Sequence, residues 1–437
     1  MRTREKPVVV AGPARQVSST MTSTTTDPAA EAASLLRQRP FLLFWASRFL
    51  GGVAGQAQTI TIAWQVYALA RLTHDVRHAA FAVGMIGLAQ FLPLFALTLT
   101  AGETADRHDR RLISSLCMLF EVLTAGALAF LAFTGVKAIW PIYLIAIAFG
   151  ASRAFLSPSN TALGPMLVPR SLLPRAIAWN SLAWQSAAIL GPALGGVLCA
   201  VSPAVSYGMS MVLYLIAAAA LFLIRAETRP QVQPGSRWAL VKEGLGYVWT
   251  NRIVFGAISL DLFAVLLGGA TALLPVYARD VLHVGAQGFG ILRAGTAVGA
   301  GSIAILLAIR PIRRKAGLYM FSGVAVFGAA TVVFALSKSL ALSVVALAVL
   351  GGADMLSVYV RQTLVQIVTP DHMRGRVGAV STLFIGASNE LGEFESGVAA
   401  RLLGPIGAAL FGGIGALVVT GAWAKLFPAL RKADRLA

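Results

Sequence analysis

The chain has 437 residues, of which 57% are hydrophobic and only 12% are charged, whereas a soluble domain carries about 25% charged residues. This composition excludes an ordinary soluble protein and indicates one that lies within a membrane. The net charge of +18 raises the question of a nucleic-acid partner. We expect none, because the basic residues fall in short loops and tails and form no separate basic face.

The first 34 residues contain no apolar core, so they do not form a signal peptide, and we predict a disordered N-terminal tail over residues 1–40. From residue 41 the chain divides into apolar runs that are long enough to cross a bilayer as helices. The composition therefore predicts an all-α integral membrane fold with twelve transmembrane helices. The predicted spans are 41–70, 79–101, 112–134, 138–160, 175–200, 202–224, 252–277, 287–309, 316–336, 340–360, 376–402 and 404–427.

Lys and Arg concentrate in both tails and in alternate loops. By the positive-inside rule, these segments, including the C-terminal tail 428–437, are cytoplasmic. We therefore predict a multi-pass protein of the inner (plasma) membrane with both termini in the cytoplasm. The one long loop, 225–251, divides the chain into two six-helix halves, 41–224 and 252–427. Its second part, with Trp238, Leu245 and Trp249 on one face, predicts a helix at the membrane surface, and a plain connector is the alternative.

The two halves resemble each other in sequence. An offset of 201 residues superposes two loops and several small residues of the following helices. The matched pairs are Pro169 with Pro370, Arg175 with Arg376, Ala178 with Ala379, Gly191 with Gly392, and Gly196 with Gly397. Parallel repeats of this kind are typical of secondary transporters, which bind substrate between the repeats near the middle of the membrane.

The loop after the second span, "AGETADRHDRR", resembles a signature of the major facilitator superfamily. The matching residues are Gly102, Ala105, Asp106, Arg107, Arg110 and Arg111, while Thr104 and Asp109 replace a Leu and a Gly of the signature. The Asp109 variant is typical of the branch of enterobactin-exporter-like transporters. The passages 47–69, 260–282 and 389–400 are similar to the same branch, and the resemblance covers nearly all of 40–430.

The resemblance implies that this loop is a cytoplasmic gate, with Asp106 as a latch between the two halves. The alternative is that its arginines only fix the membrane topology. A second passage, "GPALGG", matches a helix signature that in this superfamily accompanies exporters and antiporters. Its residues Gly191, Pro192, Gly195 and Gly196 predict a close-packed seam, and ordinary small-residue packing is the alternative.

Charged residues inside spans are costly and point to function or to ion pairs. Proton coupling needs a carboxyl group that is protonated and ionised in turn, and we predict Asp261 for this role, with Glu390 as the next candidate. The offset places Arg153 on Asp354, which could form a pair between the halves. Further charges inside spans are Arg48, Glu121, Arg293, Arg361, Glu393 and Glu395.

The first span also carries Gln56, Gln58, Gln65 and Tyr67, which could face a substrate cavity beside Arg48 or bond to neighbouring helices. No Lys follows a Gly, so a phosphate-binding loop is absent from the sequence. HExxH, GxSxG and CxxC are absent as well. We predict no enzymatic activity, no cofactor and no bound metal, and expect transport to be driven by a gradient.

The sequence thus predicts a proton-coupled exporter of a siderophore-like or other amphipathic small molecule, acting by alternating access and as a monomer. Its partners would be substrate, protons and the lipid bilayer. A multidrug or metabolite exporter unrelated to iron is the first alternative. An uptake symporter and a non-transporting receptor or scaffold on the same fold are the others.

Overall fold

The structure is a computed structural model that describes residues 35, 37–226, 228, 237–312 and 314–434. Throughout this part of the chain every regular element is helical, and it contains no strand. The predicted all-α architecture is therefore confirmed. The predicted N-terminal tail up to residue 34 and the Pro-rich start of the central linker, 229–236, lie outside the described residues.

The first half consists of six long helices, and capping residues in the sequence mark the starts of two of them. Asp75 caps the second of them by accepting the backbone N–H of His78 at 3.0 Å, and Ser202 caps the last, which has Pro203 in its first turn. The helices are α2 (Arg39–Ala70), α3 (Val76–Arg107), α4 (Arg110–Phe133), α5 (Trp140–Leu163), α6 (Leu173–Val201) and α7 (Pro203–Phe222).

The second half follows a short helix, α8 (Arg237–Thr250), which lies in the linker. The ion pair between Glu243 and Arg376 joins α8 to α14, and the Tyr247 hydroxyl donates to the carbonyl of Val368. The helices that follow are α9 (Arg252–Leu267), α10 (Leu274–Val276), α11 (Gly285–Ile309), α12 (Ala316–Leu336), α13 (Leu340–Val368), α14 (Asp371–Leu426) and α15 (Pro428–Arg431).

The predicted span 252–277 is not one continuous helix. It breaks after α9 at Gly268 and Gly269, continues as the short 3-10 turn η3 (Ala270–Leu273) and α10, and ends in a π-helical turn, η4 (Tyr277–Val281). A Cβ atom on Gly269 would lie 2.4 Å from the carbonyl oxygen of Gly392. The break therefore brings the chain against α14 more closely than any other residue type would permit.

Ten helices within the described residues are long and apolar enough to cross a membrane. The predicted number was twelve, and two features account for the difference. Helix α2 is not among the ten, although it has 32 residues, and it carries Arg48 and several glutamines. Helix α14 counts once, although its 56 residues would reach about 84 Å as a straight helix, far beyond a bilayer core of about 30 Å. Gly404 interrupts it with a φ of 78° and a ψ of 164°.

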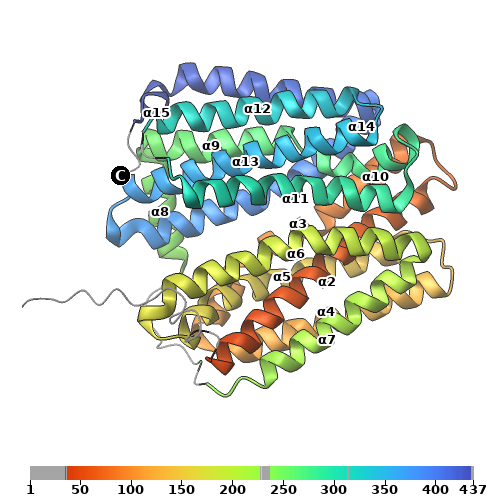
Figure 1. The fold of residues 1–437 in the computed structure, drawn as a ribbon, viewed down its shortest axis with the longest axis horizontal. Coiled ribbons are helices and arrows are strands. Elements are labelled where there is room, and N and C mark those ends of the chain that lie inside the picture. The colour runs from red at the N-terminus through yellow and green to blue at the C-terminus, as the bar shows by residue number, and fades with distance from the viewer. Residues whose placement is uncertain (1–34, 36, 227, 229–236, 313, 435–437) are drawn as a thin grey trace, which may run out of the picture.

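Figure 1 shows the two halves as two layers of long helices, with α2 to α7 in one and α9 to α14 in the other. Helix α3 packs on α14 and α6 packs on α11, so these four helices form the boundary between the halves. The repeat appears in this packing. Gly191 lies against Val53 and Gln56 of α2, and its counterpart Gly392 lies against the end of α9.

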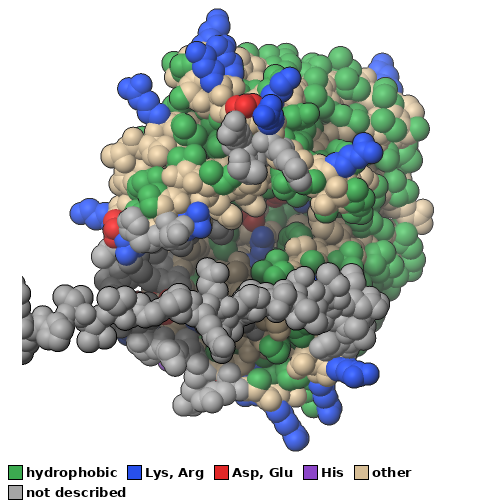
Figure 2. Space-filling view, turned by 60° about the vertical axis from the view of Figure 1, so that its left-hand side comes forward, with side chains coloured by type: hydrophobic (Ala, Val, Ile, Leu, Met, Phe, Trp, Pro, Cys, Tyr) green, Lys and Arg blue, Asp and Glu red, His purple; other side chains and the backbone are tan. Residues whose placement is uncertain are grey.

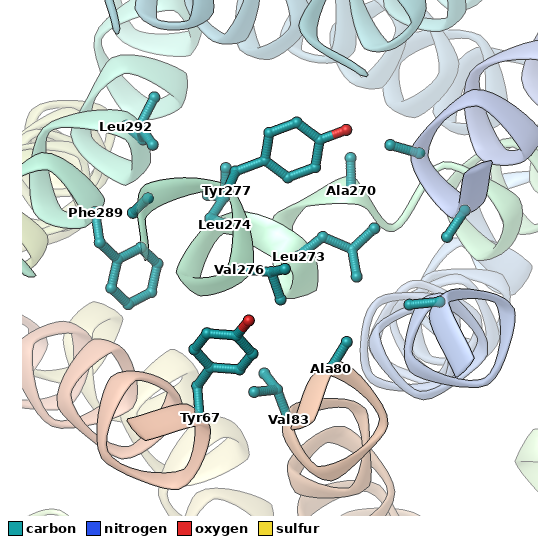
Figure 3. Close-up of a cluster of buried hydrophobic side chains, with 14 of the residues drawn as sticks. Tyr67, Ala80, Val83, Ala270, Leu273, Leu274, Val276, Tyr277, Phe289 and Leu292 are labelled. Carbon is teal, nitrogen blue, oxygen red and sulfur yellow. The ribbon is translucent and has the colours of Figure 1, made fainter. Parts of the chain in front are cut away.

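The buried apolar clusters differ between the two ends of the molecule. The largest cluster joins residues of both halves, and Figure 3 shows Tyr67 and Val83 of the first half facing Leu273 and Val276 of the second. The other three clusters each belong to a single half. The halves are therefore packed together at one end, which we call the closed end. We call the opposite end, where residues 102–111 lie, the motif end.

Candidate functional site

A cavity of about 520 Å³ lies between the two halves. Its wall includes residues of α2, α4, α5, α6 and α7 on one side and of α9, α11, α13 and α14 on the other. Figure 2 shows the motif end hollowed between the halves, with acidic and basic side chains deep in the hollow and Lys and Arg around its outer surface. The charged residues of the wall are Arg48, Glu121, Arg153, Arg293, Asp354, Glu390 and Glu393.

One ion pair crosses the cavity wall from half to half. A guanidinium nitrogen of Arg153, on α5, lies 2.9 Å from Oε1 of Glu390, on α14, and 3.0 Å from the amide oxygen of Gln90, on α3. The Glu390 side chain is only 11% exposed, whereas that of Arg153 is 42% exposed. The predicted pair of Arg153 with Asp354 is thus wrong, because residues at equivalent places in two repeats need not face each other.

Several of the other predicted charges line the same cavity. Glu121 is buried on α4 and accepts a hydrogen bond from Ser152 at 3.1 Å. Arg48 lines the cavity from the first half, and Asp354 lines it from α13 of the second. Gln56, the predicted polar residue of helix α2, also faces the cavity.

Asp261 does not lie in the cavity wall. Its carboxylate pairs with Arg361 of α13, and the two side chains are only 9% and 3% exposed. Asp261 therefore has a buried arginine of its own half as its partner. The cause is the rotation of α9, which turns the Asp261 side toward α13. Residue spacing cannot reveal this rotation in a helix that is apolar on all faces.

Two other predicted cavity residues of α2 also point elsewhere. Gln65 is buried and accepts a hydrogen bond from the Tyr207 hydroxyl at 2.8 Å, inside the first half. The Tyr67 hydroxyl donates to Asp280, which lies in the π-helical turn of the second half. Arg71 adds an ion pair with the same carboxylate at 3.2 Å. Asp280 is a residue that the sequence analysis missed, and its only signal there was a charge pair, Arg279 and Asp280, at the end of a span.

These contacts seal the closed end. Phe81 of α3 lies against Phe394 of α14 with a ring separation of 6.4 Å, and the guanidinium of Arg401 lies 5.0 Å from the centre of the same Phe81 ring. Trp64 stacks on Phe289 of the second half. The cavity is therefore separated from the closed end by a layer of contacts between the halves.

The predicted gate motif joins the end of α3 to the start of α4. Asp106 lies in the last turn of α3, 3.6 Å from Arg110, and Arg107 pairs with Glu103 in the same turn. The carboxylate at a helix N-terminus is instead Asp109, which accepts the backbone N–H groups of Arg111 and Leu112. Asp106 is therefore not in the loop between the helices, because α3 continues through Arg107.

The contacts of the motif arginines tie several helices of the first half together. Arg110 donates to the carbonyl of Ala105 at 3.0 Å and reaches Ala162 of α5, while Arg111 donates to the carbonyl of Ile224 just after α7. Gly102 is buried near the C-terminal end of α3. The motif thus holds the ends of α3, α4, α5 and α7 in register.

The glycines of "GPALGG" lie at two kinds of close contact. A Cβ atom on Gly191 would lie 2.5 Å from the Cβ of Gln56, and one on Gly195 would lie 2.8 Å from the Cα of Ala57, so both pack on α2. Gly196 instead faces the other half, where an added Cβ would lie 2.7 Å from the Cα of Gly290. Pro192 is buried within the same helix.

Residues 30–437 match the model of a family described as transmembrane secretion effectors. The chain belongs to this family of the major facilitator superfamily. The predicted superfamily and branch are therefore confirmed, and a member of a transporter family is a transporter rather than an enzyme.

The chain is similar in sequence to two groups of exporters. The chain is 29% identical over 377 residues to the multidrug efflux pump Tap of Mycobacterium tuberculosis, which covers 80% of this chain and 86% of the pump. It is 26% identical over 396 residues to the enterobactin exporter EntS of Salmonella typhimurium, with 88% of each chain covered. Both relatives are exporters, which places this multi-pass membrane protein among efflux transporters of the superfamily.

Solved structures show the same fold at low sequence identity. A bacterial homologue of the iron transporter ferroportin in an inward-facing state superposes with a TM-score of 0.65 at 17% identity, covering 89% of this chain and 99% of that one. The D-xylose–proton symporter gives a TM-score of 0.66 at 13% identity, with 90% and 99% covered.

Proposed function

We propose that the protein is a proton-coupled exporter of a siderophore-like or other amphipathic small molecule. The cavity volume of about 520 Å³ falls within the range of small-molecule sites, roughly 300–1,000 Å³. Its wall combines charged groups with aromatic side chains such as Trp184 and Phe327, which suits a molecule with both apolar and polar parts.

The observation that carries the proposal is the ion pair between Arg153 and Glu390. Because it joins the two halves at the cavity wall, its strength bears on how easily they separate. Protonation of Glu390 would remove the negative charge and weaken the link, so a proton taken up here favours separation. Asp261 is a weaker candidate for coupling than the sequence suggested, since it lies outside the cavity wall beside Arg361.

We also propose the membrane arrangement that the sequence predicts. With α2 and the two parts of α14 counted as separate spans, twelve helices cross the plasma membrane, and the motif end and both termini face the cytoplasm. The halves then correspond to 41–224 and 252–427, and the monomer is the transporting unit. In this orientation the cavity faces inward, ready to load substrate from the cytoplasm.

In this scheme Asp106 still acts as a gate residue, but from the end of α3. Transport begins when substrate enters from the motif end and ends when the closed end opens. At that stage the motif end must close, and the carboxylate of Asp106 would then face the other half.

A multidrug exporter is the second candidate, and the named relative Tap favours it. The two candidates differ in what a cell without the transporter accumulates. We suggest measuring a secreted siderophore and the dye ethidium in a deletion strain and in the same strain complemented with the gene. Siderophore retained inside the deletion strain supports the first candidate, and ethidium alone supports the second. If neither compound accumulates, export of both kinds is contradicted.

A further inference from the structure

The charged residues of the cavity wall divide into those that have a protein partner and those that do not. Arg153 is paired with Glu390 at 2.9 Å, and Glu121 accepts a hydrogen bond from Ser152. Glu393 lies within electrostatic range of a wall arginine, Arg293, and of Arg153 itself. These groups compensate one another, so none of them requires a ligand.

The two other charged residues of the cavity wall are Arg48 and Asp354. Within the described part of the chain, neither side chain has a hydrogen bond or an ion pair, although both line the cavity. A charged group inside the membrane without a partner is costly, unless water or a ligand compensates it. The two groups are opposite in sign, and they belong to opposite halves, Arg48 to α2 and Asp354 to α13.

We propose that the cavity binds a zwitterion whose acidic group is held by Arg48 and whose cationic group is held by Asp354. The assignment rests on the proposed function and names its substrate class. Arginine suits the acidic end, because its planar guanidinium binds a carboxylate or phosphate with two parallel hydrogen bonds. The apolar body of the ligand lies against Phe149, Trp184 and Phe327, which line the same space.

This arrangement links binding to the movement of the halves. A ligand that contacts Arg48 and Asp354 together bridges the first half and the second, and therefore favours the state in which they are closer. A ligand with only one charge contacts one half and leaves the other charge without a partner. The cavity should accordingly select for zwitterions over singly charged molecules of the same size.

Three dyes with a common ring system test the proposal on purified protein in nanodiscs. Rhodamine B carries both charges, rhodamine 6G is an ester that keeps only the cation, and fluorescein keeps only the anion. Fluorescence anisotropy gives the Kd of each dye. We expect rhodamine B to bind at least about ten-fold more tightly than either of the others, since each of the others leaves one charged group of the wall without a ligand partner.

Substitutions assign each charge to its residue. Arg48→Gln should weaken rhodamine B and fluorescein but leave rhodamine 6G unchanged, and Asp354→Asn should weaken rhodamine B and rhodamine 6G but leave fluorescein unchanged. Arg48→Lys should retain part of the anion binding, which shows that the fold is intact. The matched controls are Arg310→Gln, at an exposed position just after α11, and Glu395→Gln, outside the cavity wall, and neither should change any Kd.

Several results would overturn the proposal. Wild-type protein that binds none of the dyes, or that binds rhodamine 6G as tightly as rhodamine B, contradicts it. Equal losses for all three dyes in Arg48→Gln would do the same. Because the assay needs neither transport nor a gradient, failure of the zwitterion site can be distinguished from failure of the proposed function. Export that is proton-driven in vesicles, together with charge-independent binding, would refute the zwitterion site alone.

Discussion

The phenolic hydroxyl of Tyr67 donates a hydrogen bond to the carboxylate of Asp280, and this bond joins the first half to the second at the closed end. Arg71 pairs with the same carboxylate at 3.2 Å, and that hydrogen bond raises the pKa of Arg71. A raised pKa means that the contribution of Arg71 to this contact is lost only as the pH rises past that very high pKa, so the arginine carries its charge over the whole working pH range.

Tyr67→Phe should therefore loosen the closed end. A hydrogen bond to a charged group is worth roughly 1.5–3 kcal/mol, so we expect a shift of at least about ten-fold toward the state in which this end is open. Spin labels at Leu72 and Lys338, in protein with Cys117 and Cys199 replaced by alanine, would report it as a population with longer distances. The matched control is Tyr207→Phe, whose hydroxyl bonds to Gln65 inside one half. Equal effects of the two substitutions would show that the bond between the halves has no special part.

The glycine contact between α6 and α11 should tolerate no side chain. Gly196→Ala places a Cβ 2.7 Å from the Cα of Gly290 and 2.8 Å from the carbonyl of Ala286, and neither backbone atom can move without separating the helices. We expect a lower Tm and slower transport. Gly208→Ala is the control, because no atom lies within 4 Å of its added Cβ. An unchanged Tm for Gly196→Ala would mean that the halves do not touch there.

Gly191 tests packing inside the first half. Its added Cβ would lie 2.5 Å from the Cβ of Gln56 and 2.8 Å from the carbonyl of Val53. Gly191→Leu should reduce transport more than Gly191→Ala, but the structure predicts that alanine already lowers it measurably. Full activity of both variants in a transport assay would exclude a close contact between α6 and α2.

The two aspartates of the motif should differ in what they affect. Asp109→Ala removes the N-cap of α4 and a contact with Thr228, so we expect a loss of stability of about 1 kcal/mol. Asp106→Asn should leave the protein folded and inserted while transport slows severely. Thermal unfolding and transport measured on both variants separate these effects. Normal transport by Asp106→Asn with reduced expression would favour a purely topological role for the motif.

The buried pair of Asp261 and Arg361 should be structural. Asp261→Asn leaves a buried arginine without its partner, a change that typically costs about 3–5 kcal/mol. The double variant Asp261→Leu, Arg361→Met removes both charges and should recover much of the Tm. If Asp261→Asn unfolds at the wild-type temperature and loses only proton-driven export, Asp261 has the coupling role that the sequence suggested.

The long helices were predictable because apolar runs of sufficient length mark them, but the break of the predicted span 252–277 at Gly268 and Gly269 was not. The break in α14 was predictable too, since the predicted boundary between 402 and 404 coincides with Gly404 and Pro405. The direction of each polar side chain was not predictable. Gln56 and Gln65 are nine residues apart on α2, yet only Gln56 faces the cavity. The sequence could not show this difference, because a helix that is apolar on all faces gives no signal of its rotation.

The partners of the charged residues could not be predicted from the sequence either. The repeat correctly matched Gly191 with Gly392, each of which packs on the first helix of its own half. It also matched Arg153 with Asp354, but the partner of Arg153 is Glu390 on α14. A sequence repeat relates equivalent positions in two halves. Contacts between the halves join positions that are not equivalent, and they depend on the docking of the halves.

We propose that Glu390 couples export to protons through its pair with Arg153. The most direct measurement is substrate accumulation in proteoliposomes under an imposed pH gradient, beside substrate exchange without a gradient, for the wild type, Glu390→Gln and the control Glu395→Gln. Glu390→Gln should lose gradient-driven accumulation by at least about ten-fold and keep exchange, because a permanently neutral side chain cannot carry a proton. The control should keep both activities. Glu390→Gln protein that still concentrates substrate against its gradient would exclude Glu390 as the coupling residue.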